Sequence, residues 1–251
     1  MASPVFELSD SYIERLAALD PGYATALGIP GSDHLMTDFS PAGHEARETL
    51  NRATLAKLAS LNTSSDGDRL AAGVLRNSLE LSEREFAAGE HLRTIRVLAG
   101  DVDYARSVFD LMPTETAEHW RTIAERMSHV PGAFKGMRDS WSLGMQRGVV
   151  APRRQVLAVA EMLEGWAGSV ATSGFFTTLA EQGARVSGAP AEALRRAARE
   201  ASAALAETAE FLRKTYAPVA DPRNGVGEDR HALARRRYLG MDMDADDAYT
   251  W

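Results

Sequence analysis

The histidines are the residues of this sequence best suited to metal chemistry. A zinc-peptidase helix needs two histidines four positions apart, with a glutamate beside the first, so that ligands and base share one face. No two histidines here have that spacing, and Glu48 stands where a partner for His44 would be needed. His119 and His129 are ten positions apart, and we interpret them as isolated surface residues. The sequence therefore predicts no metal ligands and no catalytic residue. The histidines are His34, His44, His91, His119, His129 and His231.

Other common catalytic motifs are also missing. The sequence has no cysteine, which excludes disulfides, thiolate nucleophiles and cysteine-based metal sites. It has no Gly-x-Ser-x-Gly elbow, phosphate-binding loop or dinucleotide fingerprint. The acidic run 242–247 lacks the central glycine and distal glutamate of a calcium loop, so we expect Asp244 or Asp246 to cap a short helix. Whether the chain is an enzyme stays undecided at this point.

Charge and hydropathy limit the partners. The 251 residues include 28 basic and 35 acidic side chains, for a net charge of −7. Such a chain is a poor binder of nucleic acid, and Arg235–Arg237 is interpreted as a solvated helix face. No apolar run reaches the roughly 18 residues that span a bilayer, and the N-terminus lacks a signal-peptide pattern. We therefore expect no nucleic-acid or membrane partner and a cytoplasmic location.

Helical periodicity dominates the chain, and no useful alternating strand pattern occurs. The sequence predicts an all-α fold, an irregular multi-helix array or bundle, with a minor extended segment near 94–98 as an option. Asp20-Pro21 and Ser40-Pro41 are typical of helix starts. The Gly183–Pro190 linker suggests a division into an N-terminal helical array, 1–182, and an alanine-rich helix with C-terminal helices, 190–251, within one structural unit.

Several apolar stripes are expected to form the core. The strongest predicted stripes and faces are Trp120, Ile123, Met127 and Val130; Phe134, Met137, Trp141 and Met145; and Leu194, Ala198, Ala201, Leu205, Thr208 and Leu212. A first helix of about 5–19 is expected to bury Phe6 and Leu19 among others, and the helix after Asp68 to bury Leu70, Val74 and Leu79.

Segments along nearly the whole chain together resemble a known family. They are Phe6–Asp10, Leu16–Pro21, Leu27–Ile29, Leu35–Pro41, Arg106–Thr114, Gly148–Gln155 and Tyr238–Gly240. In order, these segments resemble the N-terminal half of the bacterial domain-of-unknown-function family 885. The shared motifs are of a structural kind and are not catalytic signatures.

The resemblance implies a role in peptide hydrolysis. Family members are much longer than this chain and resemble helical zinc carboxypeptidases, with a His-Glu-x-x-His helix in their C-terminal half; zinc would activate water and glutamate would act as base. This sequence stops before that helix, so no ligand or base is transferred, and zinc is implied only for full-length members. For this chain, the resemblance implies the role of one wall of a peptide cleft.

Arg106, Arg153 and Gln155 are the candidate substrate-binding residues of that wall. Arginine forks bind carboxylates, and glutamine can hold a peptide amide. The alternative is that Arg106 and Arg153 pair with local acids while Gln155 lies on a helix surface.

Three functional hypotheses remain open. In the first, the chain is a non-catalytic part that is truncated relative to the family and binds a C-terminal catalytic half or a second copy. In the second, it is a stand-alone helical binding or scaffold protein that has lost the peptidase chemistry. In the third, an enzyme works with carboxylates alone, but the spacing of the acids selects no pair. Tyr249 and Trp251 either belong to a longer protein or dock back onto the bundle.

Overall fold

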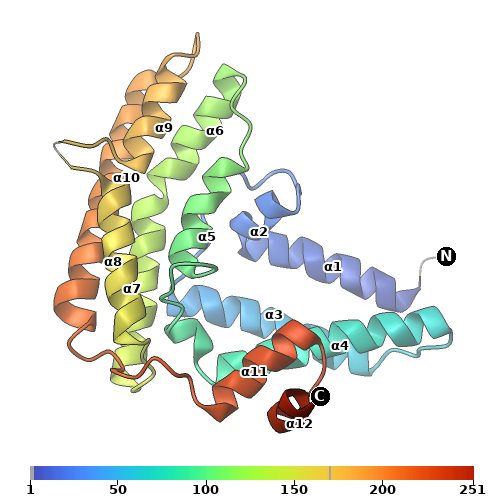
Figure 1. Ribbon diagram of the computed structural model, residues 1–251. Helices are drawn as coiled ribbons and strands as arrows, with labels where there is room; N and C mark the ends of the chain where they lie inside the picture. Colours follow the sequence, from blue (N-terminus) through green and yellow to red (C-terminus); the bar gives the residue numbers. More distant parts are fainter. Residues whose placement is uncertain (1–2, 170) are drawn as a thin grey trace.

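The computed structural model describes residues 3–169 and 171–251, which fold into an array of α-helices (Figure 1). These described residues contain no β-strand, although an isolated bridge joins Pro152 and Asp221. The prediction of an all-α multi-helix array is confirmed. None of the described helices combines the length and the hydropathy needed to cross a bilayer.

The helices follow one another through short connections. The first half contains α1 (Pro4–Leu19), α2 (Pro21–Ala26), α3 (Pro41–Ala59), α4 (Asp66–Ala87), the 3-10 turn η1 (Glu90–Leu92), α5 (Asp101–Ser107) and the 3-10 turn η2 (Val108–Asp110). The second half contains α6 (Ala117–Ser128), α7 (Val130–Gln146), α8 (Arg153–Ala167), α9 (Phe175–Ala184), α10 (Ala191–Phe211), the π-helical turn η3 (Leu212–Tyr216), α11 (Glu228–Leu239) and α12 (Ala245–Thr250).

Side-chain caps explain where several helices begin. The Asp20 carboxylate accepts a hydrogen bond from the backbone N–H of Tyr23 at 3.1 Å, and the Ser40 hydroxyl accepts one from Gly43 at 3.2 Å. Each cap precedes a proline at the first helical position, where the missing N–H costs nothing. Asp244 caps α12 through the N–H groups of Asp246 and Asp247. These three predicted helix starts are confirmed.

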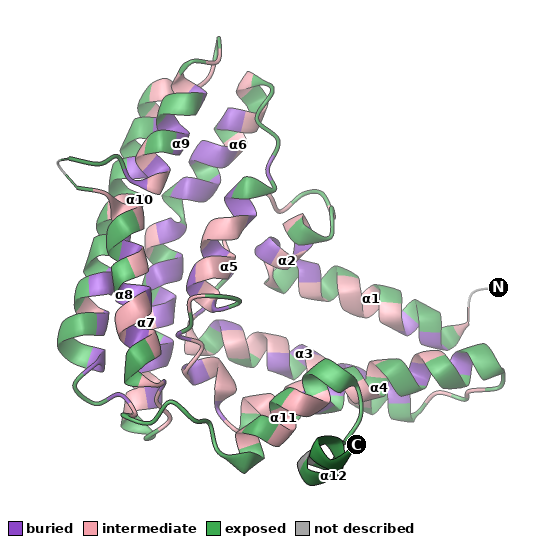
Figure 2. Cartoon of the chain, in the orientation of Figure 1, coloured by how far each residue is buried: buried purple, intermediate pink, exposed green. Residues whose placement is uncertain are grey.

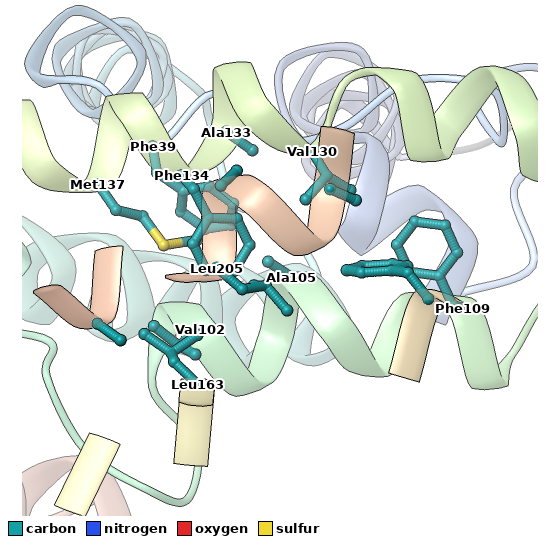
Figure 3. Close-up of a cluster of buried hydrophobic side chains, with 14 of the residues drawn as sticks. Phe39, Val102, Ala105, Phe109, Val130, Ala133, Phe134, Met137, Leu163 and Leu205 are labelled. Atoms are coloured by element: carbon teal, nitrogen blue, oxygen red, sulfur yellow. The ribbon is translucent and has the colours of Figure 1, made fainter. Parts of the chain in front are cut away.

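A bundle of α6 to α10 forms the larger body of the molecule (Figure 1). Helix α10 lies against α6, α7, α8 and α9, and the apolar residues between them form the main core. Figure 3 shows part of it, where Phe134 and Met137 of α7 lie near Leu205 of α10. The predicted stripes of α6 and α10 are buried, and on α7 only Met145 is partly exposed.

A second body, the arm, is formed by α1, α3 and α4, which extend away from the bundle (Figure 1). Its own apolar core is small and consists of Val5, Leu8, Leu58 and Ala72. Helix α11 lies against α4 and has no buried residue, as Figure 2 shows by colour. Tyr249 and Trp251 are exposed and do not dock onto the bundle.

Two faces of the arm were predicted wrongly. Phe6 is 48% exposed and Leu19 36% exposed, and α1 instead buries Val5, Leu8 and Ala17. Leu70 and Val74 of α4 are 71% and 64% exposed, although Leu79 is buried as expected. The reason is that the arm is a thin layer in which each helix covers few neighbours, so several apolar side chains remain in solvent.

The arm and the bundle meet around one fully buried arginine. Arg126 of α6 has no exposed side-chain surface. Its guanidinium donates to the carbonyl oxygens of Leu35 at 2.8 Å and Ser32 at 3.2 Å, and to the Thr25 hydroxyl at 2.7 Å. Burial lowers the pKa of this group, but arginine stays charged in proteins. The charge therefore holds the segment 21–35 against the bundle.

Small residues on α7 form a second contact with the arm. Ser140 donates to the carbonyl of Phe39 at 2.7 Å. A Cβ at Gly136 would lie 2.8 Å from the Ser40 nitrogen, and one at Gly144 would lie 2.6 Å from the Leu92 carbonyl oxygen. The spacing of four places these residues on one helix face, so two connecting segments can approach the α7 backbone closely.

The connection between η1 and α5 forms neither helix nor strand in the described structure. It includes the segment 94–98, for which an extended backbone was an option. The main core contains residues from both sides of the 183–190 linker, including Leu163 and Leu205, so the two predicted divisions share one core.

We expect Gly144→Ala to destabilise the fold, because the new methyl group would collide with the backbone oxygens of Leu92 and Val149. The expected cost is about 1–3 kcal/mol in the free energy of unfolding. Gly165→Ala is the matched control, since Gly165 also lies two residues before its helix ends and has open space around it. That variant should gain up to about 1 kcal/mol. Urea denaturation measures both, and an equal gain in the two variants would contradict the close approach.

Candidate functional site

A cavity lies on the arm and is bounded by α3, α4, α11 and the segment 90–99. Its volume is about 480 Å³, within the range of small-molecule sites. Its apolar lining includes Phe86, Leu233 and Tyr238. The charged and titratable lining consists of His44, Arg47, Glu48, Glu85, Glu90, His91, Arg96, Arg230 and Arg237. The cavity is thus a mixed surface in which a few polar groups would orient a ligand.

Helix α3 contributes His44 and Arg47 from its first two turns, which the Ser40 cap fixes in place. Arg47 donates to the Asp38 carbonyl at 2.9 Å, and its other terminal nitrogen lies 3.0 Å from Nδ1 of His44. Burial lowers the pKa of His44 to about 3, and the charge of Arg47 adds to the shift. His44 is therefore neutral at physiological pH.

His91 from η1 lies beside His44, with ring centroids 5.2 Å apart. It stacks on Phe86 of α4 at 4.1 Å with nearly parallel rings. Burial lowers the pKa of His91 to about 4, helped by the charge of Arg147. The tertiary structure thus brings together two neutral imidazoles that are far apart in sequence.

The carboxylates of the cavity are paired with arginines. Glu48 is 2% exposed, and Arg52 Nε lies 3.0 Å from its carboxylate. Burial raises the pKa of Glu48, because the charged form loses hydration. Glu90 binds Arg230 through two contacts of 2.7 and 2.9 Å, and its pKa is lowered because hydrogen bonds to Arg230 and Arg93 outweigh the effect of burial.

Helix α11 is held over the cavity by ion pairs. Arg230 reaches Glu90, and Arg237 reaches Glu85 of α4 at 3.1 Å. Arg236 donates to the side-chain oxygen of Asn77 at 2.8 Å. Because α11 has no buried residue, these polar contacts are its main attachment, so its position should depend on salt.

The predicted residues Arg106, Arg153 and Gln155 lie outside this cavity. Arg106 pairs with Asp110 at 2.7 Å, and its guanidinium lies 4.5 Å from the centre of the Phe175 ring and 5.6 Å from that of Trp166. Arg153 is exposed and Gln155 half-buried, in the first turn of α8.

The three predicted residues form no single cluster. Trp166, which Arg106 contacts, lies about 17 Å along α8 from Gln155, from the helix rise. Their role in substrate binding stays a prediction.

The resemblance implies zinc for full-length members of the family. The described residues of this chain contain no group of three or more His, Asp or Glu side chains placed to hold a metal ion. His44 and His91 lie beside each other, but Arg47 contacts one ring nitrogen of His44 with its positive charge.

Sequence reasoning missed the cavity. Its lining comes from four elements that are separated by up to 194 residues, from His44 to Tyr238. Glu48 is buried in α3 although it carries a carboxylate, and its local sequence did not indicate this. Among the cavity-lining arginines, Arg237 was interpreted as part of a solvated helix face.

We expect Arg230→Gln combined with Arg237→Gln to loosen α11, because both ion pairs to the arm are lost. Amide hydrogen exchange of residues 228–239 should become faster, by about two- to fivefold for each exposed ion pair removed. Arg213→Gln is the matched control, since it breaks a similar two-contact pair with Glu164 elsewhere. Unchanged exchange in the double variant at low salt would show that α11 is held in another way.

His44 should make stability depend on pH. Its folded pKa of about 3 lies below the ordinary histidine value of 6.5. Between these values the unfolded chain binds a proton that the folded chain does not, so stability is lost as pH falls. Below pH 6.5, the free energy of unfolding of the wild type should fall by up to about 1.4 kcal/mol per pH unit more than that of His44→Gln. Above pH 6.5, the two stability curves should be parallel. Glu48 and Asp101 titrate in both chains and cancel. Parallel curves from pH 7 to 4 would contradict a neutral buried His44.

Comparison with known proteins identifies the family and the fold. The family "Bacterial protein of unknown function (DUF885)" matches residues 21–251. No curated protein matches the chain. A solved structure, that of a "putative lipoprotein of unknown function" from Shewanella oneidensis, has a TM-score of 0.74 at 17% identity. The match covers 99% of this chain and 45% of that protein, so this chain spans less than half of its length. The chain belongs to the bacterial DUF885 family.

Proposed function

We propose that this chain is the non-catalytic, N-terminal helical part of a zinc-metallopeptidase-like protein of the family, and that it forms one wall of a peptide cleft. The single observation that carries the proposal is the coverage of the structural neighbour. Nearly all of this chain aligns with less than half of a longer protein of the same fold. In the proposal, zinc and the catalytic residues belong to the other half.

The arm cavity is the part of that wall with the properties of a ligand site. It is concave, has a volume of about 480 Å³, and combines aromatic and aliphatic side chains with charged groups. Arg153 and Gln155 would contribute from the bundle side, whereas Arg106 is already engaged by Asp110.

Exposed apolar residues near the cavity support a partner. Tyr238 is 88% exposed, Leu239 48% and Met241 56%. Apolar side chains gathered on one short segment are typical of a surface that another protein covers. In this proposal the partner is a C-terminal catalytic half, and a second copy of the chain is the alternative occupant. Cytoplasmic location stays a prediction, because the neighbour is described as a lipoprotein.

The first experiment measures zinc and peptidase activity with and without a catalytic half. The isolated chain should retain no stoichiometric zinc after dialysis and should hydrolyse no small peptide. A separately produced C-terminal half of a longer family member should bind the chain and gain peptidase activity from it. Stoichiometric zinc with peptide hydrolysis by this chain alone would overturn the proposal.

The second experiment separates the proposal from a stand-alone scaffold. A part that lacks its partner should self-associate in size-exclusion chromatography or bind a hydrophobic dye. Tyr238→Ser with Met241→Ser should reduce both signals, whereas Leu70→Ser, an exposed apolar residue elsewhere on the arm, should change them less. A stable monomer without dye binding would favour the scaffold.

A further inference from the structure

The charges that line the arm cavity do not balance. Each of its three carboxylates has an arginine partner: Glu85 pairs with Arg237, Glu90 with Arg230, and Glu48 with Arg52 of the same helix. Two lining arginines, Arg47 and Arg96, form no ion pair with a carboxylate in the described part of the chain. The cavity therefore keeps two positive charges without a counter-charge in contact.

The surroundings of Arg47 leave part of its guanidinium free. It donates to the backbone carbonyl of Asp38 at 2.9 Å and contacts the neutral ring of His44. The carboxylate of Asp38 accepts a hydrogen bond from the Ser40 N–H at 2.8 Å. Arg96 is exposed and forms no side-chain hydrogen bond among the described residues. Arginine presents a planar fork of donors that matches the oxygens of carboxylate and phosphate groups.

The remaining nearby groups form no ion pair with Arg47 or Arg96 in the described structure. His44 and His91 are neutral at physiological pH, for the reasons given above, and so add no charge. The carboxylate of Asp101 accepts a hydrogen bond from Thr94, and it lies within 4 Å of neither arginine. Burial raises the pKa of Asp101 to about 6, while the charges of Arg47 and Arg96 act in the opposite direction. The positive charges of Arg47 and Arg96 thus both act on the region around Asp101.

We propose that the arm cavity binds a small oxyanion, a carboxylate or a phosphate group, at Arg47 and Arg96. A positively charged, partly enclosed surface concentrates anions even in a protein of negative net charge, because a concave wall focuses the local field. The inference rests on the proposed function, since it names the chemical group that this wall would hold. A peptide carboxylate and free phosphate are the two sources of that group.

The test is titration calorimetry on the whole chain at low ionic strength, where screening is weak. The probes are inorganic phosphate, N-acetyl-dialanine with a free carboxylate, and the C-terminal amide of the same peptide. Phosphate or the free peptide should bind saturably, and the amide should not. Arg47→Gln and Arg96→Gln should each weaken binding by about tenfold or more, as loss of a charge-assisted hydrogen bond predicts.

Arg185→Gln is the matched control, because Arg185 is an exposed arginine on the bundle whose loss changes the net charge equally. Since Arg96 is exposed, its variant should fold even if Arg47→Gln does not. Binding that saturates with phosphate alone supports the oxyanion site and counts against a peptide ligand. Absence of saturation below about 10 mM for both anions overturns the inference. Equal binding of the amide, or equal weakening by Arg185→Gln, also overturns it, whatever the peptidase assays show.

Discussion

The buried guanidinium of Arg126 is the interaction on which the arrangement of the two bodies depends. A charge without solvent must be surrounded by oxygens, since an unsatisfied buried charge costs several kcal/mol. Here the oxygens come from Leu35, Ser32 and Thr25. Thr25 lies in α2, whereas Ser32 and Leu35 lie in the irregular connection after it, so the arginine ties both to α6. The segment leads directly into α3, so Arg126 also fixes the direction in which the arm leaves the bundle.

The two bodies are stabilised in different ways. The bundle buries large side chains such as Trp141 and Phe134 and the alanines of α10, which let neighbouring helices approach closely. The arm has a small apolar core and depends on caps, aromatic stacking and ion pairs. Salt does not screen apolar burial, whereas it screens exposed ion pairs. The cavity therefore lies in the part of the molecule whose geometry responds most readily to solution conditions.

The cavity keeps a residual positive charge, because its carboxylates are paired with arginines while Arg47 and Arg96 are not. Its imidazoles are neutral, and Arg47 contacts one ring nitrogen of His44. Nearly all of this chain aligns with less than half of the longer neighbour, and this is why we propose that it forms one wall of a site.

The sequence by itself determined the helices of the bundle and the starts of α2 and α3. The wide apolar stripes around Trp120 and Leu205 indicate which face of each helix is buried. Caps such as Asp20 and Ser40 form hydrogen bonds only with the next few residues, so they can be predicted from the local sequence. The arm was less predictable, because exposed Leu70 and Val74 follow the same periodicity as buried residues.

Only the tertiary structure decided what the polar residues do. In the sequence, Arg126 is one of many dispersed arginines. Its hydrogen-bond acceptors lie in segments about 90 to 105 residues away. His44 and His91 likewise meet only because α3 and η1 are packed together. Local periodicity reports which face of a helix is apolar, whereas charge balance in a cavity is a property of side chains gathered from distant elements. In this cavity, Arg47 and Arg96 have no counter-charge in contact. The sequence of a single helix cannot predict this, because the other charges come from distant elements.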